Sequence, residues 1–224
     1  MYLSEIENLI NEYLFDYVST KHRSHESDCG CNSMVEEMNE IRSMYTSGKY
    51  SIDKILTRCV CDRNGHQYCT SNTAINEAVT KFKNSTVIQS DLKEVPFFYG
   101  DKVIANFKDF EELYDFTKSV IGNINGIGPL TIYDTARRIG HLLDSPIYPK
   151  MYVYLSAGAE EGAKILLNTT HVDFRESIDL FRPIFGTLGS IYIEDMLCIF
   201  KNRFTKTPTP IKNNSRLTNL IGII

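Results

Sequence analysis

The sequence lacks the two features that would associate the chain with a membrane. None of its apolar runs approaches the roughly 18 residues that a transmembrane helix needs. Its first 18 residues carry four acidic side chains among the apolar ones. A secretory signal instead has basic residues followed by a continuous apolar stretch. We therefore expect a cytoplasmic protein without a membrane partner.

The chain also lacks a large excess of either charge, except near its last residues. The formal net charge of −4 argues against a protein coated with basic surface. Residues 201–224, however, hold five basic side chains and no acidic one. A flexible basic tail of this kind suits binding to phosphate backbones, and a solvated tail that keeps the protein soluble explains the same composition.

Apolar periodicity predicts a mainly α protein, a helical bundle. Residues recurring at i, i+3 and i+4 predict helices over 2–18, 34–45, the start of 51–69, 71–84, 107–122, 130–143, 150–155, 160–168, 173–182 and 190–201. Residues 85–104 have no helical period and contain Pro96 and Gly100, which predicts a short strand pair or an irregular link. We place a boundary there, giving domains over 1–100 and 101–200 and a flexible tail over 201–224.

Two glycines one residue apart, Gly126 and Gly128, lie between the helices predicted over 107–122 and 130–143. Glycine tolerates positive φ and has no side chain, so the chain can reverse tightly while Ile127 enters the core. Pro129 fits the first turn of the helix that follows. The bare amides then face outward at a helix N-terminus, where the helix dipole favours an anion. A plain helical hairpin with a glycine turn is the simpler interpretation.

This stretch resembles the helix-hairpin-helix motif of DNA-binding and DNA-repair proteins. The resemblance covers about 35 residues, Phe107 to Leu143, although Ile132 stands where alanine is usual. It implies binding to the phosphate backbone of duplex DNA with little sequence specificity. The residues expected to contact or support DNA are Gly126, Ile127, Gly128, Leu130, Thr131, Arg137 and Arg138. Arg137 and Arg138 belong to a face predicted to be outward, which a merely solvated charged face also explains.

Residues 148–167 look like a degenerate second copy of the hairpin, with Gly158 aligned to Gly128 and Ser156 opposite Gly126. In tandem members of that family, two hairpins straddle one minor groove. The alternative interpretation is that the small residues of this stretch let two helices approach closely.

No catalytic residue can be assigned from the sequence. Bifunctional glycosylases with a similar loop carry a lysine just before the Thr, whereas this chain has Leu130 there, so the amine nucleophile is missing. The aspartate expected about 20 residues later is not matched, because Asp144 comes too early and Asp173 too late. A repair or nuclease-type enzyme using His66 or Asp144 stays an alternative, as does a hairpin that docks another protein.

Cysteine and histidine are concentrated near the N-terminus. The cluster comprises His22, His25, Cys29, Cys31, Cys59, Cys61, His66 and Cys69. Zinc takes four thiolate or imidazole ligands, and Cys59, Cys61, His66 and Cys69 could close one structural site. Alternatively, the Cys29 and Cys31 pair joins Cys59 and Cys61, or the cysteines are reduced and partly buried without a metal. Disulfides are not expected, because a reducing compartment is the default without a signal.

Overall fold

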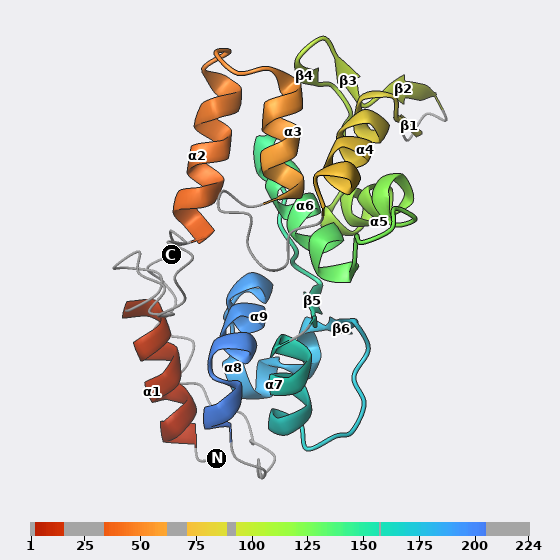
Figure 1. Cartoon of the computed structure of the whole chain (residues 1–224). Helices are drawn as coiled ribbons and strands as arrows, with labels where there is room; N and C mark the ends of the chain where they lie inside the picture. The colour runs from red at the N-terminus through yellow and green to blue at the C-terminus, as the bar shows by residue number, and fades with distance from the viewer. Residues whose placement is uncertain (1–2, 16–33, 62–70, 89–92, 157, 205–224) are drawn as a thin grey trace. The chain divides into compact units, whose positions relative to one another are not determined.

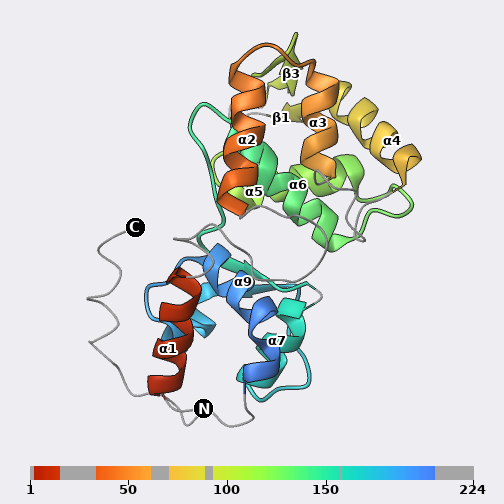
Figure 2. The same cartoon turned by 60° about the vertical axis from the view of Figure 1, so that its left-hand side comes forward.

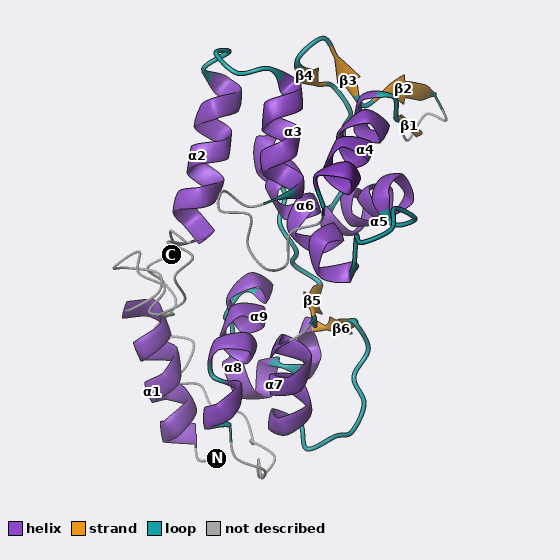
Figure 3. Ribbon diagram, in the orientation of Figure 1, coloured by secondary structure: helices purple, strands orange, loops and turns teal. Residues whose placement is uncertain are grey.

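The computed structural model describes residues 3–15, 34–61, 71–88, 93–156 and 158–204 (Figure 1). The described chain is mainly α, as predicted, and its strands are only two or three residues long (Figure 3). It divides into two compact units. We call residues 25–148 the central unit, and residues 1–24 with 149–224 the terminal unit.

These units do not follow the boundary expected near residue 100. The central unit contains helices from both predicted domains, whereas the predicted N-terminal helix belongs with residues beyond 149. The reason is that the apolar face of that helix (Ile6, Leu9, Ile10 and Tyr13) is buried in one core with residues 153–204. Helical periodicity identifies such a face, but it does not say which distant segment covers it.

The central unit is a bundle in which one helix is enclosed by three others. Its helices are α2 (Met34–Thr46), α3 (Ile52–Val60), α4 (Asn72–Lys83), α5 (Phe110–Ile121) and α6 (Pro129–Leu142). Helix α6 packs against α2, α3 and α5, and α4 packs against α3 and α5. The side chains of Ser51, Ser71 and Asp109 cap α3, α4 and α5, as expected of N-cap residues.

Two small hairpins lie between α4 and α5, so of the two alternatives for residues 85–104, a short strand pair or an irregular link, the structure shows strand pairs. Strands β1 (Thr86–Ile88) and β2 (Glu94–Pro96) pair antiparallel, with Val87 opposite Val95. Strands β3 (Phe98–Tyr99) and β4 (Lys102–Val103) also pair antiparallel. Between β2 and β3 the fully buried Phe97 packs on Phe82 of α4 and Phe116 of α5. This aromatic contact makes the segment part of the unit's core instead of a linker between domains.

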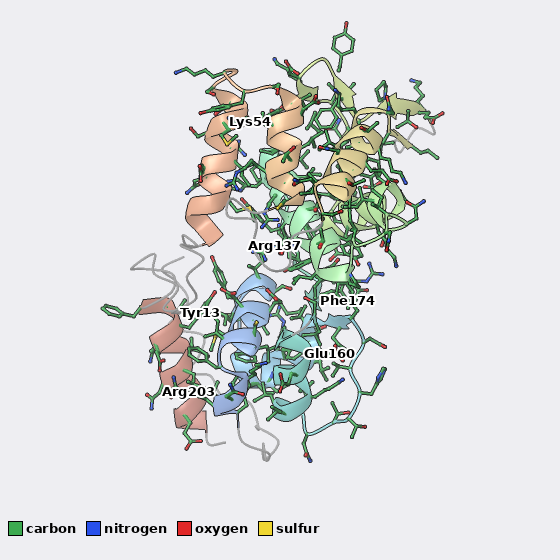
Figure 4. The ribbon with its side chains drawn as sticks, in the orientation of Figure 1. Tyr13, Lys54, Arg137, Glu160, Phe174 and Arg203 are labelled. Carbon is green, nitrogen blue, oxygen red and sulfur yellow. The ribbon has the colours of Figure 1, made fainter. Side chains whose placement is uncertain are left out.

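The terminal unit joins its N-terminal helix to the last third of the described chain. Its elements are α1 (Leu3–Tyr13), β5 (Tyr152–Tyr154), α7 (Gly158–Leu166), β6 (Arg175–Ser177), η2 (Ile178–Leu180), α8 (Arg182–Phe185), α9 (Ser190–Ile199) and η3 (Lys201–Arg203). Helix α9 lies between α1 and α7 (Figure 2). The Tyr13 hydroxyl donates a 2.8 Å hydrogen bond to Oδ2 of the buried Asp195, which ties α1 to α9 (Figure 4).

Helices predicted over 150–155 and 173–182 are wrong in part. Residues 152–154 form β5, which pairs antiparallel with β6, and residues 178–185 form only the short helices η2 and α8. The proposed second hairpin over 148–167 therefore has no first helix. Its glycines serve close packing instead, because a Cβ at Gly162 would lie 2.1 Å from the Leu197 carbonyl oxygen on α9. Local periodicity did not separate a short buried strand from a helical turn.

The first four residues of the tail expected over 201–224 belong to the described fold. Residues 201–203 form η3, and Phe204 is buried in the core of the terminal unit. Lys201 pairs with Glu161 at 2.5 Å, and Arg203 pairs with Glu12 at 2.6 Å. Two of the five basic side chains of the tail are thus engaged within the fold. The other three, Lys206, Lys212 and Arg216, lie outside the described residues.

Candidate nucleic-acid interface at the glycine turn

Two backbone hydrogen bonds between residues three apart in the sequence form the turn between α5 and α6. The amide of Ile124 donates to the Ile121 carbonyl, and the amide of Ile127 donates to the Ile124 carbonyl, each at 3.1 Å. Between them Gly126 has φ +90°, a conformation that glycine adopts without the cost a side chain imposes. The conformation of the turn therefore favours glycine at position 126, whether or not the turn binds a ligand.

The same turn buries its apolar residues and leaves its glycines open. Ile124 and Ile127 are 4% and 8% exposed, so both side chains belong to the core of the central unit. A Cβ added at Gly126 or Gly128 would meet no atom within 4 Å. The turn therefore places the Ile124 and Ile127 side chains inward, as the sequence predicted for Ile127, and leaves open space beside Gly126 and Gly128.

The first turn of α6 has no side-chain cap. Gly128 is the N-cap, Pro129 follows it, and the first turn carries no acidic residue. Within the described residues, the amides of Gly126, Gly128, Leu130 and Thr131 donate to no acceptor. Four donors at a positive helix end form an arrangement that can bind one or two anionic oxygens.

Lys81, which the sequence did not single out, contributes a positive charge beside this turn. It lies in the last turn of α4, and its Nζ donates a 2.7 Å hydrogen bond to Oδ1 of Asn123 in the turn. It is also 3.4 Å from Glu77 one helical turn earlier. Because Lys81 and Asn123 are 42 residues apart, only the packing of α4 on α5 brings them together. Lys118, in the last turn of α5, is a second exposed cation nearby in sequence.

Arg137 and Arg138 are not on an outward face, and that prediction is wrong. They are 5% and 8% exposed, respectively. Arg137 lies 3.7 Å from Asp134 and over the ring of Tyr133. Arg138 Nη1 donates to the Cys59 carbonyl at 3.2 Å. The cause is that α6 is covered by three helices, so the face assigned to solvent packs against α3 and α2. Arg138 thus connects α6 to α3, whereas Asp134 and Tyr133, which Arg137 contacts, belong to α6 itself.

The proposed zinc ligands are only partly described. Cys59 is a fully buried residue of α3, and Cys61 follows that helix as its C-cap. Cys61 is disulfide-bonded, which differs from the expectation of reduced thiols. A disulfide sulfur is not the thiolate that zinc requires. His66 and Cys69, like His22, His25, Cys29 and Cys31, lie outside the described residues. Among the described residues, no group of three or more His, Cys, Asp or Glu could hold a metal ion.

The described fold places no further catalytic group beside the two candidate catalytic residues, Asp144 and His66. Asp144 is an exposed residue shortly after α6, and His66 lies outside the described residues. Histidine at 141, next to this region, is instead engaged with Tyr148 at 2.7 Å. The only arrangement at the turn with an evident chemical use is the set of outward amides.

Comparisons with known proteins give no relative: no protein family, no curated protein and no solved structure matches the chain. No helix in the described part of the chain has the length and apolar character needed to cross a membrane. Functional inference therefore rests on the turn itself.

Proposed function

We propose that the protein binds the phosphate backbone of duplex DNA, without sequence specificity, through the turn between α5 and α6. The observation that carries this proposal is the group of four outward amides at Gly126, Gly128, Leu130 and Thr131. Amides carry no net charge, so they allow a protein with a formal charge of −4 to bind an anionic polymer. The resemblance of this stretch to the helix-hairpin-helix motif supports the same conclusion.

The partner is recognised by its phosphates and not by its bases. Backbone amides reach phosphate oxygens but do not distinguish base pairs. The buried Arg137 and Arg138 do not contribute to this interface, which leaves the turn and its neighbouring lysines as the contact surface. A contact with so few phosphates gives a shallow salt dependence, with a slope of about −0.9 for each neutralised phosphate.

A single substitution separates binding from folding at this site. Aspartate is a preferred N-cap residue, so Gly128→Asp should stabilise α6 by a few tenths of a kcal/mol, roughly the difference between a good cap and glycine. The same carboxylate would accept the amides that hold phosphate and would repel the DNA. We expect duplex DNA binding, measured by anisotropy across a salt series, to weaken by about tenfold or more, because charge-assisted hydrogen bonds contribute about 1.5–3 kcal/mol.

The matched control is Gly189→Asp, because Gly189, like Gly128, is a glycine N-cap without a side-chain hydrogen bond. It adds the same charge at the start of α9 and should leave DNA binding near that of the native protein. Equal binding by Gly128→Asp and Gly189→Asp would overturn the proposal. Absence of DNA binding by the native protein at low salt would also overturn it, and would favour a turn that docks another protein.

A further inference from the structure

The chain folds back on itself after α6, over Leu143–Tyr148, a segment that we call the exit strap. The Ile147 amide donates a 3.2 Å hydrogen bond to the Gly140 carbonyl. A Cβ at Gly140 would lie 2.6 Å from the Ile147 carbonyl oxygen, so glycine is required for this approach. The exit strap ends at Tyr148, and the terminal unit begins at the next residue.

Arg42 of α2 holds the start of the exit strap. Its Nη1 donates to the His141 carbonyl at 2.6 Å and to the Leu143 carbonyl at 3.3 Å. Carbonyls at a helix C-terminus otherwise lack partners within the helix, and a cation is favourable at that end. Arg42 therefore provides a hydrogen-bond donor for the free carbonyl groups at the C-terminal end of α6. It also places a permanent positive charge beside His141.

His141 holds the other end of the exit strap through Tyr148. Nδ1 of His141 and the Tyr148 hydroxyl are 2.7 Å apart, and their ring centroids are 5.9 Å apart. Nε2 of His141 is buried and has no hydrogen-bond partner among the described residues. A neutral imidazole tolerates this arrangement when its single proton is on Nδ1, which then donates to the Tyr148 hydroxyl oxygen and leaves Nε2 unprotonated.

We propose that the exit strap is a pH-responsive latch, closed while His141 is neutral and released when His141 is protonated. Protonation places a second positive charge beside the Arg42 guanidinium in a half-buried site. It also adds an N–H at Nε2 that no described residue accepts. A buried donor without an acceptor and a desolvated charge both cost free energy, so the protonated ring gains by leaving the site for water.

The electrostatic surroundings agree with this geometry. Burial, and then the charge of Arg42, lower the pKa of His141 below its ordinary value of 6.5. The negative end of α6 would act in the opposite direction, but Arg42 binds the carbonyls that create it. Protonation and release of the exit strap therefore occur below the pH at which an exposed histidine takes up its proton.

The other charged groups around α6 have partners of their own. On α3, Arg58 lies 3.6 Å from Glu40 of α2. On α6, Arg137 pairs with Asp134, and Arg138 donates to the Cys59 carbonyl. On α5, Glu111 of the first turn has a buried carboxylate oxygen, whereas the fully buried residues of this helix carry no formal charge, and Asp144 of the exit strap is exposed. Arg42 is thus the charged group that acts on His141 within the closed latch.

The chain connects the two units twice, and release would change the connection that follows Tyr148. The six residues of the exit strap would join the connection instead of lying against α6. Each extended residue spans at most about 3.3–3.6 Å, so the released connection would lengthen by up to roughly 20 Å. This consequence does not depend on whether the glycine turn binds DNA.

Hydrogen exchange tests the latch directly, with the Ile147 amide as its reporter. Protection factors, which remove the intrinsic effect of pH on exchange, should be at least about threefold lower for Ile147 at pH 5 than at pH 8. Amides of the α5 core, such as those of Leu113 and Tyr114, should keep theirs. Loss of protection in both places would mean general unfolding and would overturn the proposal.

Three variants distinguish a latch from a purely structural contact. The side-chain amide of His141→Gln can still donate to the Tyr148 hydroxyl oxygen but does not titrate, so protection of Ile147 should no longer depend on pH. Arg42→Gln keeps a donor for the carbonyls and removes the repulsion, so the midpoint of release should move to higher pH. Tyr148→Phe should lower protection at pH 8 as well. An unchanged pH dependence in His141→Gln, or an unmoved midpoint in Arg42→Gln, would overturn the latch.

Discussion

The Nζ of Lys81 donates to Oδ1 of Asn123 across 2.7 Å, which places a helix-borne cation on the turn that carries the outward amides. Amide donors fix the position of a bound phosphate, but a point charge adds the long-range attraction that they lack. The Lys81 ammonium has three donors, so its bond to Asn123 leaves donors for an approaching phosphate. Lys81 is therefore the side chain we expect to share a phosphate with the turn.

Replacing Lys81 by glutamine should reduce the salt dependence of DNA binding. Loss of one phosphate contact lowers the slope of log K against log salt by about one. The matched control is Lys83→Gln, because Lys83 is in the same helical turn and, like Lys81, pairs with a carboxylate, but its partner is Asp53 of α3 and it has no bond to the turn at Asn123 in the described residues. Salt titrations of duplex DNA binding by the two variants provide the measurement. Equal slopes for both variants would show that Lys81 does not contact DNA. That result would not contradict the proposal for the backbone amides of the turn.

The glycine turn was predictable because its determinants are local. Gly126, Ile127 and Gly128 fix a positive φ, a buried side chain and a helix start within three residues. Nothing distant in the sequence is needed to place them. The same holds for the caps Ser71 and Asp109, each of which accepts an amide three residues later.

The features that could not be predicted from the sequence are those that depend on which helices pack against each other. Arg137 and Arg138 belong to a polar stripe that periodicity assigns to solvent, yet α3 and α2 cover it. Lys81 lies beside the turn only because α4 packs on α5, and its partner Asn123 is 42 residues away in the sequence. The N-terminal helix had a clear apolar face, but no local pattern indicated that Asp195, 182 residues away from Tyr13, would lie against it. Tertiary packing decided each of these cases.

Gly162 should be among the least replaceable residues of the terminal unit. A Cβ there would lie 2.1 Å from the oxygen and 2.8 Å from the carbon of the Leu197 carbonyl, both backbone atoms. We expect Gly162→Ala to lower the free energy of unfolding by about 1–3 kcal/mol, the usual cost of overpacking, despite the better helix propensity of alanine. Gly158→Ala should cost less, because the nearest atom to its Cβ is the Cys198 sulfur, which belongs to a side chain. Urea unfolding of the two variants compares them, and a larger loss at Gly158 would contradict this account of α7 and α9.

The half-buried His141 should make the free energy of unfolding decrease as the pH falls below the ordinary pKa of histidine. Its pKa is lowered in the folded protein by burial and then by Arg42, relative to the ordinary 6.5. As pH falls through 6.5 the unfolded chain therefore binds a proton before the folded chain does. The stabilisation is fully present above about pH 6.5 and is lost as pH falls toward the folded pKa.

Urea unfolding at several pH values measures this dependence. His141→Gln should lack the component that falls below pH 6.5, whereas His171→Gln, at a site whose side chain is 81% exposed, should retain it. Since carboxylates also titrate in acid, the comparison between the two variants is the informative quantity. Parallel stability profiles for the native protein and His141→Gln would contradict the burial of a neutral imidazole.

The hydroxyl of Tyr13 should contribute measurably to holding α1 in the terminal unit. It donates to Oδ2 of Asp195, and both side chains are buried. Tyr13→Phe keeps the ring and removes this donor from a buried carboxylate, which should cost about 1–3 kcal/mol of unfolding free energy. Tyr99→Phe is the matched control, because Tyr99 is 77% exposed and water can solvate its hydroxyl, so its loss should stay within about 0.5 kcal/mol. Chemical unfolding followed by circular dichroism compares the variants, and exchange of the α1 amides shows whether the loss is local. Equal stabilities for the two variants would mean that apolar packing alone holds α1.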